Sequence, residues 1–116
     1  MSQETPLFAK TFDLLVYLFP VVDKFPRSHR AVLGRRIQET GLGFLDLLLQ
    51  ARKSAANQRP ALLHQSDVEL DRLRYAVRLS HEIGLISQKQ YVHAAGLLGE
   101  VGKLLGSWIK HRDSAK

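Results

Sequence analysis

The stretch that most constrains the fold is residues 90–110, QYVHAAGLLGEVGKLLGSWIK, which has the apolar periodicity of a long amphipathic helix. At 100° per residue, one broad apolar arc contains Ala94, Leu97, Leu98, Val101, Leu104, Leu105, Trp108 and Ile109. A neighbouring arc carries Gly96, Gly99, Gly102 and Gly106. Each glycine costs a helix about 1 kcal/mol relative to alanine, so their clustering predicts that another backbone comes close on this side. The rest of the chain must pack around this helix.

Helical periodicity extends over most of the chain. The sequence predicts helices at about residues 6–23, 27–53, 60–83 and 88–112. Pro20 predicts a kink or an early end in the first helix. Gly84 is expected to stop the third helix, and Ser87 with Gln90 to form a capping box at the start of the fourth. No segment alternates with period two, so the predicted fold class is all-α. The architecture is an antiparallel up-down-up-down four-helix bundle formed by one domain, residues 1–116.

Apolar residues that one bundle core cannot bury predict self-association. These extra lines are Leu42, Leu45 and Leu49 on the second helix and Val68, Tyr75 and Leu79 on the third, with the glycine face Gly99, Gly102 and Gly106 on the fourth. Contiguous apolar surface of this kind is typical of subunit interfaces, so a homo-oligomer is expected. The alternative is that irregular packing within one subunit absorbs these side chains.

Composition narrows the class of partner. The chain has 116 residues, no cysteine and a net charge of +6, and ten of its 17 basic residues are arginine. No uninterrupted apolar run approaches the roughly 18 residues of a membrane span, and the N-terminal segment lacks a basic region typical of signal peptides. We therefore expect a soluble, cytoplasmic protein that does not enter a membrane. Arginine suits phosphate recognition, which favours nucleic acid or another polyanion as a partner.

The basic residues form three groups along the chain. They are Lys24, Arg27, Arg30, Arg35 and Arg36 around the start of the second helix, Arg52, Lys53 and Arg59 around the second loop, and Arg74 with Arg78 on the third helix. Phosphate binding needs several cations on one surface. Antiparallel topology puts the first two groups at opposite ends of the bundle. A single patch would therefore have to run along one side or across subunits.

Motifs of enzymes and cofactor sites are missing from the sequence. The five histidines lack Glu-x-x-His or His-x-x-x-His spacing, and there is no phosphate loop or nucleophile elbow, so we expect no metal, no cofactor and no catalytic residue. One enzymatic alternative stays open. Small four-helix ribonucleases use an Arg-x-x-x-x-His motif, and Arg59 and His64 in RPALLH have that spacing, although Pro60 departs from the usual pattern.

Three stretches together resemble a known family. They are YLFPVVDKFPRSHR at residues 17–30, LRYAVRLSHEIGLIS at residues 73–87 and LLGEVGKLLGSWIK at residues 97–110. In this order they are similar to the accessory variability determinant proteins of diversity-generating retroelements. These proteins belong to a wider group of small bacterial four-helix proteins, some of them encoded within ribosomal-RNA intervening sequences. The third stretch, with its Glu-Val-Gly-x-x-Leu-Gly-x-Trp-Ile pattern, separates the retroelement branch from its relatives.

The resemblance implies a non-enzymatic accessory subunit of a retroelement reverse transcriptase. Family members form basic, barrel-shaped pentamers that bind the reverse transcriptase and template RNA, or an RNA/DNA hybrid, and support mutagenic cDNA synthesis. Arg74 and Arg78 match a basic pair of the family, and Arg27 matches a basic position after proline. We expect these three residues, with Arg30, Arg35 and Arg36, to meet phosphate or an acidic partner surface. The alternative is a stand-alone structural or interaction protein of the intervening-sequence type.

Overall fold

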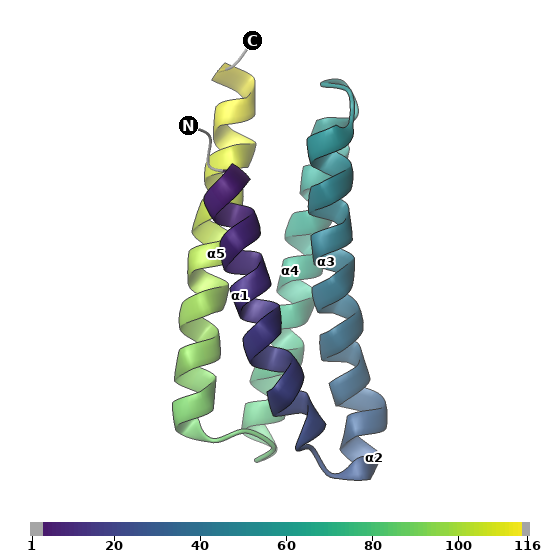
Figure 1. Cartoon of the computed structure of the whole chain (residues 1–116), viewed down its shortest axis with the longest axis vertical. Helices are drawn as coiled ribbons and strands as arrows, with labels where there is room; N and C mark the ends of the chain where they lie inside the picture. The colour runs from purple at the N-terminus through teal and green to yellow at the C-terminus, as the bar shows by residue number, and fades with distance from the viewer. Residues whose placement is uncertain (1–3, 115–116) are drawn as a thin grey trace.

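Four antiparallel helical arms make up the part of the chain that the computed structural model describes, residues 4–114 (Figure 1). The elements in order are α1 (Glu4–Asp23), α2 (Arg27–His29), the π-helical turn η1 (Arg30–Gly34), α3 (Arg35–Lys53), α4 (Arg59–Glu82) and α5 (Gln88–Ser114). Because α2, η1 and α3 follow one another as a single arm, the architecture is a four-helix bundle with extents of 48 × 23 × 19 Å. The prediction of an all-α bundle is confirmed, and no strand occurs between residues 4 and 114.

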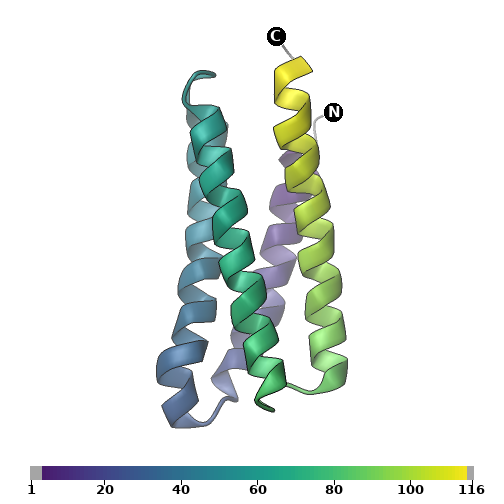
Figure 2. The same cartoon turned by 180° about the vertical axis from the view of Figure 1, so that it is seen from behind.

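The arms are arranged in a square in which each helix packs against two neighbours. α1 packs against α3 and α5, and α4 packs against the same two helices from the opposite side (Figures 1 and 2). The connections after α1 and after α4 lie at one end of the bundle, and the loop between α3 and α4 lies at the other end (Figure 1). Residues 1–3 and 115–116 of the predicted domain lie outside the described residues.

Apolar stripes from all four arms meet in one core. Its largest fully buried side chains are Phe44, Leu7, Leu14, Leu18, Leu48, Leu63, Leu70, Leu73, Leu105, Val22, Val77 and Val101. Four hydroxyl groups, of Thr11, Thr40, Ser66 and Ser80, are buried among them. Each donates to the carbonyl four residues earlier at 2.7–2.9 Å. These four buried hydroxyl groups are therefore satisfied within their own helices.

The turn between α4 and α5 has the predicted chemistry. Gly84 has φ of +84°, and the Leu85 N–H donates to the carbonyl of Ser80 at 2.8 Å, as in a Schellman motif. The Ser87 N–H donates to Oε1 of Gln90 at 2.9 Å, and the Gln90 N–H donates to Oγ of Ser87 at 3.1 Å. The expected helix stop and the expected capping box are both confirmed.

The arm predicted as one helix at residues 27–53 is interrupted. In η1 the turn widens, and the Arg35 N–H donates to the carbonyl of Arg30, five residues back. Gly34, at the end of this turn, is buried against α1, where an added Cβ would lie 2.8 Å from Cγ1 of Val22. The widening was not predicted from the sequence. It occurs where the second arm packs closely against α1, and this contact is known only once the helices are placed.

Helix α1 is unusually apolar. It continues for three residues beyond Pro20 and ends at Asp23. Among the described helices, its stretch Thr5–Asp23 alone is long and apolar enough to cross a membrane by length and composition, a criterion that core helices also meet. One side of this stretch faces the core, and Lys10 on another side pairs with Glu100 of α5 at 3.4 Å.

Candidate nucleic-acid interface

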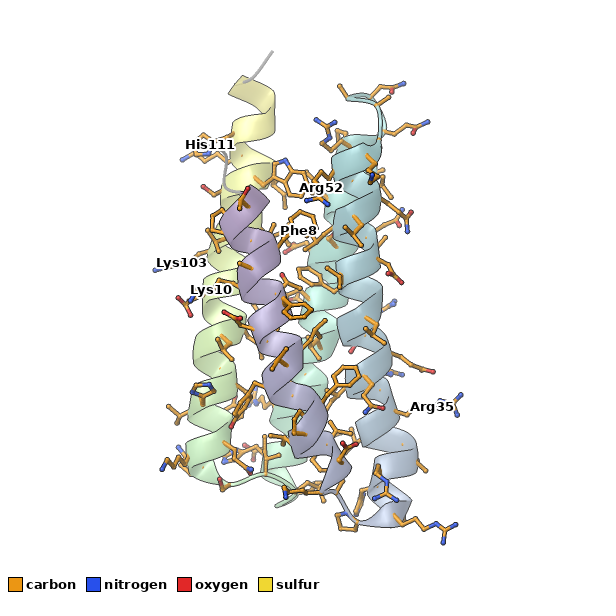
Figure 3. The ribbon with its side chains drawn as sticks, viewed as in Figure 1. Phe8, Lys10, Arg35, Arg52, Lys103 and His111 are labelled. Carbon is orange, nitrogen blue, oxygen red and sulfur yellow. The ribbon has the colours of Figure 1, made fainter. Side chains whose placement is uncertain are left out.

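The bundle separates the predicted basic groups along its long axis. Arg35 and Arg52 mark this separation and lie toward opposite ends (Figure 3). The group around the start of the second arm lies at the end where α1 and α4 finish, and the group around the α3–α4 loop lies at the other end (Figure 1). The two groups therefore do not form one patch on a single subunit.

The arginines near the α3–α4 loop stabilise the fold. Arg59 donates from Nε to the carbonyl of Ala51 at 3.0 Å and from Nη2 to the carbonyl of Ser54 at 2.8 Å. Its guanidinium thus caps the C-terminal end of α3, where free carbonyls favour a cation. Arg52 lies over the ring of Phe8, 4.2 Å from its centroid, and joins α3 to α1 (Figure 3).

The engagement of Arg59 weakens the ribonuclease alternative. A catalytic arginine would have to direct its guanidinium at the scissile phosphate, whereas that of Arg59 is held on two carbonyls of its own chain. His64 lies one turn along α4 and is exposed. Helix capping therefore accounts for Arg59, the first residue of the Arg-x-x-x-x-His spacing.

The arginines at the opposite end are exposed. Arg30 donates to the carbonyl of Asp23 at 3.4 Å, and Arg35 pairs with Glu39 at 3.1 Å on the surface of α3. For Arg27 and Arg36, no ion pair is found among the described residues. Arg27 and Arg36 are therefore exposed, with no ion pair among the described residues that a phosphate would have to displace.

Arg74 and Arg78 border a groove of about 280 Å³ between α4 and α5. This α4–α5 groove is lined by Asp71, Arg74, Tyr75, Arg78, Tyr91, Ala95 and Leu98. Arg74 reaches across it and donates from Nη2 to the carbonyl of Leu98 at 3.3 Å, while its Nη1 lies 3.7 Å from Oδ1 of Asp71. Arg78 is exposed and has no ion pair within the described part of the chain. The two predicted arginines therefore line the same groove, but Arg74 is held by internal contacts whereas Arg78 has no ion pair among the described residues.

A second groove, of about 530 Å³, lies on the other side of Tyr75. This η1–α4 groove is lined by Val32, Leu33, Arg36, Val68, Asp71, Arg72, Tyr75, Ala76 and Leu79. This groove is lined by both Arg36 and Arg72. The sequence predicted Arg36 as a site residue but did not predict Arg72. The missed signal is the spacing of Arg72 and Tyr75, which lie three residues apart on one helical face.

The predicted extra apolar lines stay at the surface of the subunit. Leu42, Val68, Tyr75 and Leu79 are exposed, and Leu45 and Leu49 are partly buried. Phe12 and Val16 of α1, which also fall outside the inward arc of their helix in the sequence, are exposed as well, Phe12 to 62%. The alternative to self-association was that packing within one subunit buries these side chains. The structure fully buries none of them.

Phe12 and Val16 belong with the predicted line on α3. Three contacts set the register of α1 against α3: Phe8 with Arg52, Leu15 with Gly41 and Val22 with Gly34. By this register, Phe12 and Val16 lie beside the α3 line. We call Phe12, Val16, Leu42, Leu45 and Leu49 the α1–α3 apolar surface.

The glycine arc of α5 does not receive a second backbone within the described chain, so that expectation is wrong for a single subunit. A Cβ added at Gly96, Gly99 or Gly106 would meet no atom within 4 Å. A Cβ added at Gly102 would collide with the guanidinium of Arg74. The bare backbone at Gly102 thus makes room for a long side chain from α4, and the other three glycines face open space.

Fold and surface together define a class of protein: a small basic four-helix bundle whose arginines border open grooves. Among the side chains that the structure describes, residues 5–111, no three His, Asp or Glu are grouped as a metal site. The chain belongs to the bAvd-like family, whose model matches residues 7–112. This match confirms the family resemblance seen in the sequence. A search of curated proteins gives no match.

Proposed function

We propose that this protein is a non-catalytic, nucleic-acid-binding accessory subunit of a diversity-generating retroelement reverse transcriptase. It acts in the cytoplasm as a homo-oligomer and supports template-RNA binding and mutagenic cDNA synthesis, while the polymerase supplies the chemistry. The observation that carries this proposal is the family match over residues 7–112, because that family implies association with a reverse transcriptase. The presence of a reverse-transcriptase gene and a near-repeat pair beside this gene would support it. Their absence would favour the intervening-sequence type of protein.

RNA contact is proposed for Arg27, Arg30, Arg35, Arg36, Arg74 and Arg78. Arg27, Arg36 and Arg78 support this role, since none of them has an ion pair among the described residues that a phosphate would have to break. The exposed pair of Arg35 with Glu39 contributes roughly 0.3–0.5 kcal/mol and is readily exchanged. Such contacts release counterions, so binding should weaken steeply as salt rises.

Charge reversal tests this interface. Each lost phosphate contact should lower the slope of log K against log salt by about 0.7 for single-stranded RNA. We expect Arg74→Glu/Arg78→Glu to weaken RNA binding and to flatten the slope by between one and two such contacts, because Arg78 is exposed whereas Arg74 is also held by Leu98 and Asp71. Circular dichroism checks that the bundle stays folded. The matched control is Lys53→Glu/Lys103→Glu, which changes net charge equally at exposed sites elsewhere. Equal losses in both variants would show that only net charge matters and would refute these site residues.

Self-association is supported by two apolar surfaces on different sides of the subunit. One is the α1–α3 apolar surface, and the other consists of Val32, Val68 and Leu79 in the η1–α4 groove. Contacts between two unlike surfaces are heterologous and close into rings when the rotation fits. The resemblance implies a ring of five. Gly99 and Gly106 stay candidates for the same contacts, whereas Arg74 already covers Gly102.

Light scattering coupled to size exclusion tests the oligomer, with protein freed of nucleic acid by nuclease and high salt. We expect a mass of five times the 13.1 kDa of one chain. Leu42→Lys and Leu79→Lys each place a charge on one of the two surfaces and should give smaller species. Val92→Lys is the control, because Val92 is an exposed apolar residue of α5 outside both surfaces. If the wild-type protein were monomeric, the proposed homo-oligomer would be wrong.

A further inference from the structure

Tyr75 occupies an unusual position between the two grooves of α4. Its side chain lines both the η1–α4 groove and the α4–α5 groove, and the residue is 67% exposed. Arg72 and Arg78 lie three residues to either side on the same helical face, the spacing at which helix side chains are neighbours. The ring is thus presented to solvent between Arg78 and Arg72, of which Arg72 pairs with Glu69 at 3.2 Å, and it makes little contribution to the core.

Two side chains that line the α4–α5 groove beside this ring, Tyr91 and Arg74, are held in place by other residues. Tyr91 is held by stacking on His81, with ring centroids 4.4 Å apart and an angle of 13° between the planes. Arg74 is anchored on the carbonyl of Leu98 and pairs with Asp71, which reduces the charge that Asp71 presents to the groove. Arg78 is then the groove's cation without a fixed partner among the described residues.

Small residues leave the α5 side of the groove open. Ala95 lines the groove, and Gly102, about two turns further along α5, lies under the guanidinium of Arg74. Gly99 lies between them in sequence, and a Cβ added there would meet no atom within 4 Å. The α5 backbone is therefore open to solvent at Gly99 and covered by Arg74 at Gly102.

We propose that the α4–α5 groove binds an unpaired nucleotide of single-stranded nucleic acid, with its base stacked on Tyr75 and its phosphate held by Arg78. This inference deepens the proposed function and rests on it, because it specifies the form of nucleic acid that the Arg74 and Arg78 surface recognises. An aromatic ring flanked by arginines is the combination that single-strand binding proteins use, since every base has a face that can stack. Bases inside a duplex are already stacked and cannot reach the ring. The proposal moves Tyr75 from the predicted subunit interface to the nucleic-acid site.

The test compares single-stranded and duplex RNA of equal length at one salt concentration. Fluorescence anisotropy of a labelled oligouridylate measures the first affinity, and a labelled RNA duplex measures the second. We expect Tyr75→Leu to weaken binding of the single strand about 5- to 150-fold and to leave the affinity for the duplex within about twofold of the wild-type value. Tyr75→Phe keeps the ring and should retain the wild-type affinity. Val92→Ala is the control, because it shortens an exposed apolar side chain of α5 outside the groove and outside both apolar surfaces.

A second readout reports stacking directly. An oligonucleotide containing 2-aminopurine should lose fluorescence on binding wild-type protein and Tyr75→Phe, and lose much less on binding Tyr75→Leu at saturating protein. Equal affinity of wild type and Tyr75→Leu for the single strand would overturn the proposal, and so would an equal loss for single strand and duplex. A smaller oligomeric mass for Tyr75→Leu would overturn it in favour of a subunit contact. If wild-type protein bound no RNA at all, the proposed function itself would fail, which separates the two failures.

Discussion

Replacing Gly41 by alanine tests the close approach of α1 and α3. Gly41 is buried on α3, and a Cβ built there would lie 2.6 Å from Cδ2 of Leu15, a core residue of α1. No real Cβ contact is this short, so either the leucine or the helix must move. Overfilling a packed core in this way costs about 1–3 kcal/mol.

Alanine also stabilises a helix interior relative to glycine, by about 1 kcal/mol. The net change for Gly41→Ala is therefore between about zero and a loss of 2 kcal/mol. Gly96→Ala isolates the propensity gain, because nothing lies within 4 Å of a Cβ added there. The difference between the two variants removes that gain and should equal the packing cost, roughly 1–3 kcal/mol in favour of Gly96→Ala.

Urea unfolding followed by far-UV circular dichroism measures this difference, with equal protein concentrations because the proposed oligomer couples stability to concentration. In a thermal scan the same difference corresponds to about 4 °C per kcal/mol. A double-mutant cycle identifies the cause. Leu15→Val removes the colliding methyl group, so Gly41→Ala should cost about 1 kcal/mol less in that background than in the wild type. Equal stability of Gly41→Ala and Gly96→Ala would refute the reasoning.

Three further substitutions probe local contacts. Gly84→Ala should cost about 1–2 kcal/mol of unfolding free energy in urea, because alanine must adopt the positive φ of +84°. Ser87→Ala should cost about 1 kcal/mol, since the N-cap acceptor of the Gln90 N–H is lost. Arg59→Ala should cost roughly 1–2 kcal/mol by uncapping α3, and a drop of less than a few tenths would show that its two hydrogen bonds contribute nothing. Incubation of pure protein with labelled RNA should give no cleavage that depends on His64. Cleavage lost in His64→Ala would revive the ribonuclease alternative.

Local features were predictable where one residue fully determines the backbone. A glycine followed three residues later by serine, with glutamine three residues beyond, predicts a helix stop and a capping box, and Gly84, Ser87 and Gln90 form both. Apolar periodicity likewise predicts which face of each helix is buried, because a buried stripe must recur every 3.6 residues. The extra apolar lines were predictable for the same reason, since Val68 and Leu79 fall outside the core stripe of α4.

Side-chain partners across the bundle were not predictable, because they depend on helix register. Arg59 and Arg74 look alike in sequence as surface cations, yet one caps α3 and the other donates to the carbonyl of Leu98 on α5. The widened turn η1 has the same origin, since it occurs where Gly34 meets Val22 of α1. Long flexible side chains choose among backbone acceptors only after the helices are placed. The sequence therefore pointed to the basic residues without separating those that lack an ion pair among the described residues from those that hold the fold together.

The glycines show most clearly what a pattern leaves undetermined. A glycine in a helix indicates a missing side chain, but different neighbours can use the space. At Gly41 the space is filled by Leu15 of the neighbouring helix α1, and at Gly102 by Arg74 of α4. At Gly99 the space stays open to solvent. An open glycine lowers the stability of α5 by about 1 kcal/mol without a compensating contact inside the subunit. Because a small domain has only about 5–15 kcal/mol of net stability, several open glycines on one helix are costly. That cost is best offset by something outside the subunit, either a second copy or the nucleic acid proposed for the adjacent α4–α5 groove.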